Sequence, residues 1–191
     1  MGQCMSNFII KYNTDIFTFE SDVLIQGCNC FNTMGAGIAK EIKRIFPDAW
    51  KADLATIKGD KNKLGTFTFS SNKTKPYYIV NLYTQYTYWD KQDMFYVDAF
   101  YKGMASVIDF FIGKRAKANK ENKTITFSLP AIGLGLANGK PEDIFLVLKN
   151  FEKKYDEKDN IIIALCLHKK DINLNDIFKN LQSKYSKNKS S

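Results

Sequence analysis

Apolar and polar positions along the chain follow two different spacings, which together predict strands separated by helices. Short runs that are mostly apolar, or that alternate, are typical of strands, whereas apolar residues recurring every three or four positions are typical of helices. Strands are predicted over residues 8–12, 23–27, 64–69, 77–83, 125–129 and 161–167. Helices are predicted over residues 37–46, 48–58, 93–111, 141–155 and 174–185, and the polar stretch 114–123 is predicted as a surface loop.

The order of these elements predicts an α/β fold. The runs VLIQG and IIIALCL are almost fully apolar, as expected for strands that are buried on both faces. Most of the predicted strands are separated by a helix, and such a pattern favours helices on both sides of a sheet. We therefore expect a three-layer α/β/α domain around a mixed, largely parallel central sheet.

Length and composition fit one domain, spanning residues 1–191. The chain has 191 residues, of which 45% are hydrophobic, enough for a sizeable core. It contains no apolar run of the roughly 20 residues that span a bilayer, and no signal-peptide segment at its amino terminus. We expect a soluble cytoplasmic protein with no membrane partner, acting as a monomer. Residues 1–6 are predicted to be a loose terminus, although MGQCMS also fits the myristoylation pattern through Gly2 and Ser6.

The net charge of +8 suits an anionic ligand or a nucleic acid. Most of the positive charge is lysine, spread through loops and the carboxyl-terminal stretch KYSKNKSS, of which residues 186–191 are predicted to be a frayed basic tail. The sequence has no aromatic RNA-binding motif and no arginine-rich stripe. We interpret the lysines as a solvated surface and keep a nucleic-acid partner as an alternative.

Cysteine and histidine are too scattered for a structural zinc site. The cysteines are Cys4, Cys28, Cys30 and Cys166, and His168 is the one histidine. Cys28 and Cys30 form C-x-C rather than the C-x-x-C of redox and zinc motifs. We predict buried free thiols and no metal, and keep a nucleophile pair of Cys30 with His168 as an alternative.

Two glycine-containing stretches each follow a predicted buried strand. GCNCFNTMGAG follows VLIQ, and PAIGLGLANG follows ITFSL. In open α/β sheets, ligands bind beyond the carboxyl ends of the strands, where glycines allow the backbone to approach a ligand and helix amino termini suit phosphate oxygens. Neither stretch has the spacing of a P-loop or of G-x-G-x-x-G. The two stretches together predict a shared anion site.

The same stretches carry a resemblance to a known family. Through nearly the whole chain and in the family's order, the sequence has TDIF, VLIQGCNC, MGAGIA, IKRIFPDAW, KLGTF and LPAIGLGL. It resembles the macrodomains, which bind ADP-ribose, and within them the branch of ADP-ribose 1''-phosphate phosphatases and of antitoxins that reverse DNA ADP-ribosylation. The resemblance implies a nucleotide ligand and no cofactor.

The resemblance also implies a role for individual residues. Asp15 matches the aspartate that accepts a hydrogen bond from the adenine amino group, although an aspartate here can also cap a turn. Ile16 lines the adenine pocket, and Asn29 contacts the distal ribose. The remaining implied ligand contacts come from the two glycine stretches: Gly35, Ala36, Gly37 and Ile38 in the first, and Ala131, Ile132, Gly133, Leu134, Gly135 and Leu136 in the second.

Catalysis is where the chain departs from its relatives. Gln26 replaces a histidine of the phosphatases, Gln85 replaces the reactive lysine of the antitoxins, and Ala137 with Asn138 replaces an aspartate found in some relatives. Glutamine and asparagine do not act as general bases near neutral pH. Asn29, which would position water with the help of loop amides, is the predicted catalytic residue.

Three functions are compatible with the sequence. The first is a hydrolase that removes a group from the distal ribose, such as the phosphate of ADP-ribose 1''-phosphate. The second is a non-catalytic binder of ADP-ribose or of another NAD-derived signal. The third is removal of ADP-ribose from nucleic acid or protein. Asp90, Asp93 and Lys140 are candidates for proton transfer in any reaction.

Overall fold

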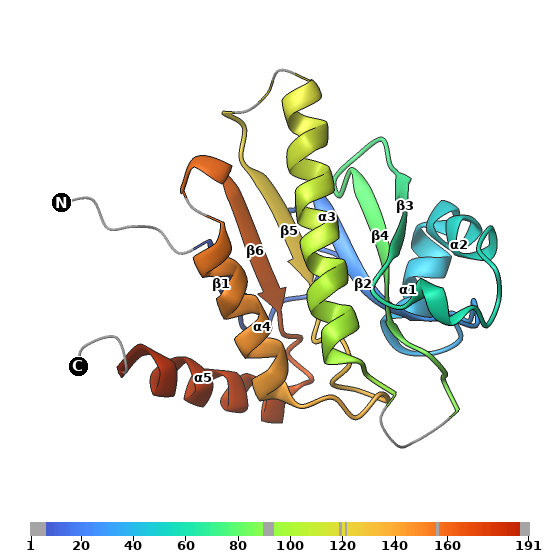
Figure 1. Ribbon diagram of the computed structural model, residues 1–191. Coiled ribbons are helices and arrows are strands. Elements are labelled where there is room, and N and C mark those ends of the chain that lie inside the picture. The colour runs from blue at the N-terminus through green and yellow to red at the C-terminus, as the bar shows by residue number, and fades with distance from the viewer. Residues whose placement is uncertain (1–6, 90–93, 119, 121, 156, 188–191) are drawn as a thin grey trace.

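The computed structural model describes residues 7–89, 94–118, 120, 122–155 and 157–187 (Figure 1). The strands are β1 (Phe8–Lys11), β2 (Val23–Asn29), β3 (Phe67–Ser71), β4 (Tyr78–Gln85), β5 (Ile125–Leu129) and β6 (Ile161–Cys166). The α-helices are α1 (Gly37–Ile45), α2 (Pro47–Leu54), α3 (Val97–Lys117), α4 (Pro141–Lys154) and α5 (Ile172–Lys187). Two 3-10 helices, η1 (Lys61–Lys63) and η2 (Glu157–Asp159), complete the described elements.

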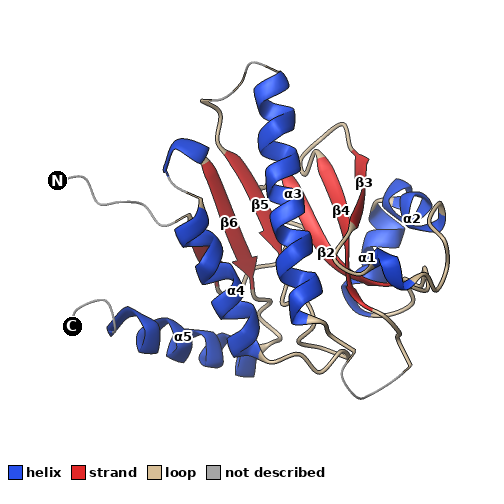
Figure 2. Cartoon of the chain, viewed as in Figure 1, coloured by secondary structure: helices blue, strands red, loops and turns tan. Residues whose placement is uncertain are grey.

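The six described strands form one sheet in the order β1-β6-β5-β2-β4-β3. Every neighbouring pair is parallel except β3 with β4, which is antiparallel. The prediction of a mixed, largely parallel sheet is confirmed. Because five strands run the same way, the loops that follow them gather at one edge, at the lower end of the sheet in Figure 2.

Helices cover both faces of the sheet, which confirms the three layers. In β2, Val23 and Ile25 face a core shared with α3, α4 and α5, whereas Leu24 faces Ile42 of α1 and Ala49 of α2. This alternation follows from the two-residue period of a strand. Figure 1 shows α3 and α4 crossing the near face of the sheet.

Several predicted boundaries differ from the observed ones. Pro47 begins α2 instead of only ending α1, because proline suits the first position of a helix. Helix α3 begins four residues later than predicted and runs through Lys117, so residues 114–117 are helical and not loop. Helix α5 continues to Lys187, which includes the first part of the predicted frayed tail.

Some predictions lie outside the described residues. These are the loose amino terminus with Gly2, Cys4 and Ser6, the proposed proton-transfer residues Asp90 and Asp93, and the last part of the tail, residues 188–191. Among the described residues, no helix is both long and apolar enough to cross a membrane.

The close contact of α3 with β4 gives a prediction about stability. A Cβ added at Gly103 would lie 2.4 Å from Cδ1 of the buried Leu82, so Gly103→Ala overpacks the core and is expected to lower the free energy of unfolding by about 1–3 kcal/mol. Gly113→Ala is the matched control on the same helix, because its Cβ would meet no described atom within 4 Å. Since alanine is the better helix former, the control should gain up to about 1 kcal/mol. Urea unfolding of both variants measures this, and equal effects would contradict the packing described.

Candidate functional site

The two glycine stretches meet at the carboxyl edge of the sheet. Gly27, near the end of β2, lies against the loop that follows β5: a Cβ added there would be 2.6 Å from Cγ2 of Ile132 and 3.1 Å from Oγ1 of Thr84. A residue with a side chain at position 27 would push the second loop away. The structure therefore brings together the two loops that the sequence analysis paired.

The turn after β2 is held from within by Asn29. Its Oδ1 accepts hydrogen bonds from the backbone N–H of Phe31 (2.9 Å) and from Oγ1 of Thr33 (3.0 Å), and its Nδ2 donates to the carbonyl of Thr33 (3.0 Å). Asn29 is 8% exposed. The residue predicted to face the distal ribose thus also fixes the shape of its own loop, and one Nδ2 hydrogen is left for another acceptor.

The stretch that follows leads into the amino terminus of α1 and is open to solvent. Gly35, Ala36 and Gly37 are exposed, and a Cβ at either glycine would meet no described atom within 4 Å. Gly37 has φ +54°, which glycine adopts without strain. Within the described part of the chain, no side chain caps α1 and no acidic residue lies in its first turn. The first backbone N–H groups of α1 therefore carry partial positive charge that no side-chain cap or acidic residue of the first turn neutralises.

The loop after β5 forms a tight ring of backbone. The N–H of Gly139 donates to the carbonyl of Gly133 (2.8 Å), and the N–H of Leu134 donates to the carbonyl of Ala131 (3.2 Å). Gly133 has φ +78°, and a Cβ there would lie 2.3 Å from the ring of Phe95. Both the backbone conformation and the close ring require glycine at this position.

The outer part of the same loop faces solvent. Leu136 is 77% exposed, and a Cβ at Gly135 would meet no described atom within 4 Å. Ile132 is buried, so its side chain packs inside the protein and only its backbone could reach a ligand. Ala137 is buried as well, whereas Asn138 is exposed with φ +54°.

Asp15 and Ile16 lie at the same edge, beyond β1. The N–H of Thr14 donates to the carbonyl of Leu167 (2.8 Å), which ties this segment to the end of β6. Oδ1 of the exposed Asp15 accepts from the N–H of Phe17 (3.0 Å), so the turn-capping role exists. No hydrogen bond within the described residues involves its second carboxylate oxygen, and that oxygen remains available to a ligand. Ile16 is buried in a cluster with Leu24 of β2 and Ile42 of α1.

Of the two glutamines singled out in the sequence, Gln26 is fully buried in β2. Its Nε2 donates to Oδ1 of Asn81 (2.7 Å) and contacts Sδ of Met34 (3.7 Å). It therefore belongs to the interior packing between the sheet and α2. Gln85, at the end of β4, is half-buried.

The described cysteines are poor nucleophiles. Cys28, Cys30 and Cys166 are buried free thiols. Burial raises the pKa of Cys28 well above its ordinary value, that of Cys30 to about 11 and that of Cys166 to about 12, so all three stay protonated near neutral pH. Cys30 follows β2 and His168 follows β6, and β5 lies between these two strands in the sheet. The alternative nucleophile pair of Cys30 with His168 therefore follows strands that are not neighbours. The described residues contain no cluster of three or more side chains suited to a metal ion.

An aromatic cluster beside the first loop was not singled out from the sequence. The ring of Phe31 packs edge-on against Tyr86 (5.3 Å between centroids) and Trp89 (4.6 Å), and Tyr88 packs against Trp89 (4.9 Å). Trp89 is 56% exposed. Nζ of Lys61 lies 4.9 Å from the centroid of Tyr86. The stretch YTYW, residues 86–89 directly after β4, is unusually aromatic for a loop, and this is the signal that could have found the cluster.

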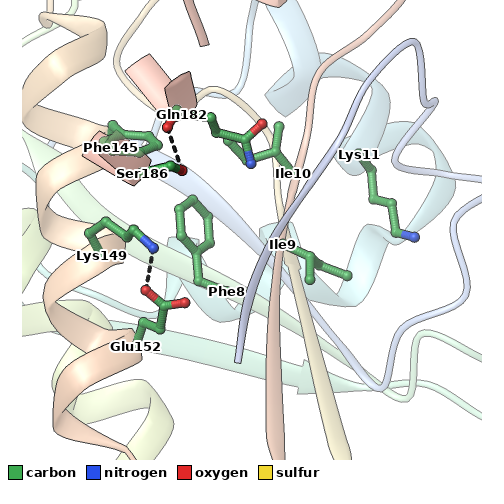
Figure 3. A pocket seen from close by; sticks show the side chains of 9 residues that line it. All are labelled: Phe8, Ile9, Ile10, Lys11, Phe145, Lys149, Glu152, Gln182 and Ser186. Carbon is green, nitrogen blue, oxygen red and sulfur yellow. Dashed lines mark hydrogen bonds and ion pairs between the residues drawn. The ribbon is translucent and has the colours of Figure 1, made fainter. Parts of the chain in front are cut away.

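A separate cavity of about 500 Å³ lies along β1, away from these loops (Figure 3). It is lined by side chains of β1, α4 and α5, including Phe8, Phe145 and the ion pair of Lys149 with Glu152. A smaller cavity of about 190 Å³ lies at the opposite end of the sheet, against the amino-terminal residues of β2, β4 and β5. Neither cavity includes a residue of the glycine loops.

Comparison with known proteins gives a sequence relative and several structural neighbours. No protein-family model matches the chain. Over 156 residues the chain is 33% identical to an uncharacterized 17.5 kDa protein in the tk-vs intergenic region of Enterobacteria phage T4, covering 78% of this chain and 93% of that protein.

Among solved structures, the macrodomain of Mycobacterium tuberculosis DarG matches with a TM-score of 0.59 and 19% identity, over 83% of this chain and 97% of that one. A mutant Oceanobacillus iheyensis macrodomain with ADPR matches with a TM-score of 0.65 and 14% identity, over 92% and 94%. Thermosipho africanus DarTG in complex with ADP-ribose matches with a TM-score of 0.60 and 16% identity, over 82% of this chain and 40% of that one.

The expected fold is thus confirmed by structural similarity, and the sequence identity establishes a family relationship. The chain belongs to the same family as the phage T4 protein, and its fold is that of a macrodomain.

Proposed function

We propose that the protein binds ADP-ribose, or a close derivative of it, across the carboxyl edge of the sheet. The observation that carries the proposal is the meeting of two exposed glycine loops over β2, with the uncapped amino terminus of α1 beside them. Backbone N–H groups in this arrangement suit the oxygens of a diphosphate. Structural neighbours that contain ADP-ribose support the same ligand for this chain.

The order of the strands suggests the direction of the ligand. Asp15 and Ile16 lie near the ends of β1 and β6, where adenine would bind. The diphosphate would lie between the stretch 35–38 and the stretch 131–136, at the ends of β2 and β5. The distal ribose would then point toward Asn29 and the end of β4.

For the reaction, we propose hydrolysis of the phosphate of ADP-ribose 1''-phosphate. The oxygen of water would bond to phosphorus while the bond from phosphorus to the ribose oxygen breaks, giving ADP-ribose and inorganic phosphate. Asn29 and the loop N–H groups would position the phosphate and stabilise its charge. A non-bridging phosphate oxygen can take the proton of the attacking water, since no side chain of the first loop is a general base near neutral pH, and that proton then passes to the departing ribose oxygen, which becomes a hydroxyl. Turnover by this route should be slow.

A second candidate function is removal of ADP-ribose from nucleic acid. The cluster of Phe31, Tyr86, Tyr88 and Trp89 lies beyond the proposed distal ribose, where an attached macromolecule would be. The exposed rings of Tyr88 and Trp89 suit stacking of bases, and Lys61 beside Tyr86 suits contact with a phosphate backbone. If neither substrate is turned over, the protein is a binder of ADP-ribose.

The ligand assignment predicts a specific effect of Asp15→Asn. Wild-type protein at an ADP-ribose concentration of about 100 times the dissociation constant should gain nearly 3 kcal/mol of stability, seen as a rise in melting temperature. Asparagine keeps the oxygen that accepts from Phe17 but replaces the second acceptor with a donor, so affinity for ADP-ribose should fall at least tenfold. Affinity for ribose 5-phosphate, which lacks adenine, should not change. An equal loss for both ligands would refute the adenine contact, and no thermal shift of wild type at millimolar ADP-ribose would refute the ligand.

The reaction predicts a contrast between Asn29→Ala and Cys30→Ser. Phosphate release from saturating ADP-ribose 1''-phosphate should fall by about 100-fold in Asn29→Ala, the lower part of the range for a lost transition-state hydrogen bond. Cys30→Ser should keep most of the activity, because that thiol is buried and protonated. Thr33→Val is the structural control, since it removes one hydrogen bond to Asn29 and leaves the amide in place.

The same assay should include an ADP-ribosylated oligonucleotide, which separates the two candidate reactions by their products. An inactive Cys30→Ser beside an active Asn29→Ala would indicate thiol chemistry and contradict the mechanism. A wild-type protein that releases neither phosphate nor ADP-ribose would leave the binder as the function.

A further inference from the structure

A buried ion pair lies directly beneath the first loop of the site. Lys63 in η1 is 6% exposed and Asp53 in α2 is 0% exposed, and Nζ of Lys63 lies 3.7 Å from Oδ1 of Asp53. Charged side chains are rarely buried to this degree, because removing them from water is costly unless they are paired and hydrogen-bonded. The position of the pair under the loop suggests why the protein keeps it.

The ammonium of Lys63 holds the loop at two points. Nζ donates to the backbone carbonyl of Cys30 (3.2 Å) and to Oδ1 of Asn32 (2.9 Å). It also lies 4.3 Å from the centroid of the Tyr83 ring, at a distance that favours a cation–π contact. Besides its ion pair with Asp53, the lysine therefore donates two hydrogen bonds to residues that lie one and three positions after Asn29.

Asp53, the acidic partner in α2, holds the same loop through its backbone carbonyl. Tyr83 Oη donates to Oδ1 of Asp53 (2.8 Å), and the backbone carbonyl of Asp53 accepts from Nδ2 of Asn32. Nδ2 of Asn32 also contacts Oγ1 of Thr56 (3.1 Å). Asn32 has φ +56°, a conformation that non-glycine residues rarely adopt and that its several hydrogen bonds stabilise.

These contacts form one connected path to the proposed catalytic amide. Lys63 fixes Cys30 and Asn32, which flank Phe31, and the N–H of Phe31 donates to Oδ1 of Asn29. A shift of the loop would break that bond and turn the Asn29 amide. Because catalysis and ribose contact tolerate little displacement, a rigid support under the loop has a functional use.

We infer that Lys63 is a positioning residue for the distal-ribose side of the site, acting through the turn 29–33 and never touching the ligand. The inference rests on the proposed function for its effect on ligands, but its effect on the loop can be measured without any ligand. The competing explanation is that the ion pair serves folding stability alone.

The test compares Lys63→Met/Asp53→Asn with Asp53→Asn. The double variant removes both charges together, which avoids a buried unpaired carboxylate. The single variant leaves the Lys63 ammonium without its carboxylate partner but keeps its two hydrogen bonds to the loop, so both variants lose the ion pair and differ in the loop contacts. Affinity for ADP-ribose should fall at least tenfold in the double variant relative to the single one. Affinity for ADP, which has no distal ribose, should stay within about twofold.

A second readout needs no nucleotide. The backbone N–H of Phe31 should exchange with deuterated solvent at least tenfold faster in the double variant than in Asp53→Asn, because its acceptor is no longer held in place. If the double variant does not fold, Asn32→Gly provides the same test, since glycine adopts φ +56° and removes the side chain that Lys63 holds; its reference is then wild type.

Equal losses for ADP-ribose and ADP, or unchanged exchange at Phe31, would overturn the inference and leave a role in stability alone. If wild-type protein binds neither nucleotide, the proposed function fails, and the exchange measurement still decides the role of Lys63.

Discussion

The close approach of the second loop to the end of β2 is the contact on which the whole site depends. Gly27 allows it, because the methyl group of Ile132 occupies the space that any side chain at position 27 would need. The loop is fixed from its other side by Phe95, whose ring lies against Gly133 and Gly139. Glycine is required at these positions for packing, and the proposed ligand would bind where the two loops meet.

The region beneath the first loop is more polar than the other side of the sheet. Between the sheet and α2 lie Gln26, Asn81, Asp53 and Lys63, all buried, whereas the core against α3, α4 and α5 is almost entirely apolar. Four buried side-chain atoms have no hydrogen-bond partner within the described residues: Oε1 of Gln26 and Oδ2 of Asp53 in this region, and Oγ1 of Thr84 and Nε of Arg115 elsewhere. Buried polar groups cost stability when they are incompletely satisfied. Their concentration under the turn 29–33 suggests that the protein gives up some stability to hold that turn in one shape.

Much of the fold could be predicted from the sequence, because apolar runs such as 161–167 are long enough and uniform enough to read as buried strands. Boundaries were less predictable. Three of residues 114–117 are charged, yet they continue α3, since the carboxyl-terminal turn of a helix accepts lysine and arginine well. The two glycine loops were recognised from their glycines and from their position after predicted buried strands. The aromatic cluster and the support from Lys63 could not be, because both depend on contacts between segments about 30 to 60 residues apart.

The central claim is that one nucleotide bridges both glycine loops, and mapping of amide chemical shifts during titration with ADP-ribose tests it most directly. The account predicts the largest shifts at Gly35, Gly37 and Ile38 on one side and at Gly133 and Gly135 on the other, saturating at the same ligand concentration. Residues that line the cavity of Figure 3, such as Ile9 and Gln182, should show no change. Shifts confined to one loop, or centred on that cavity, would contradict the account.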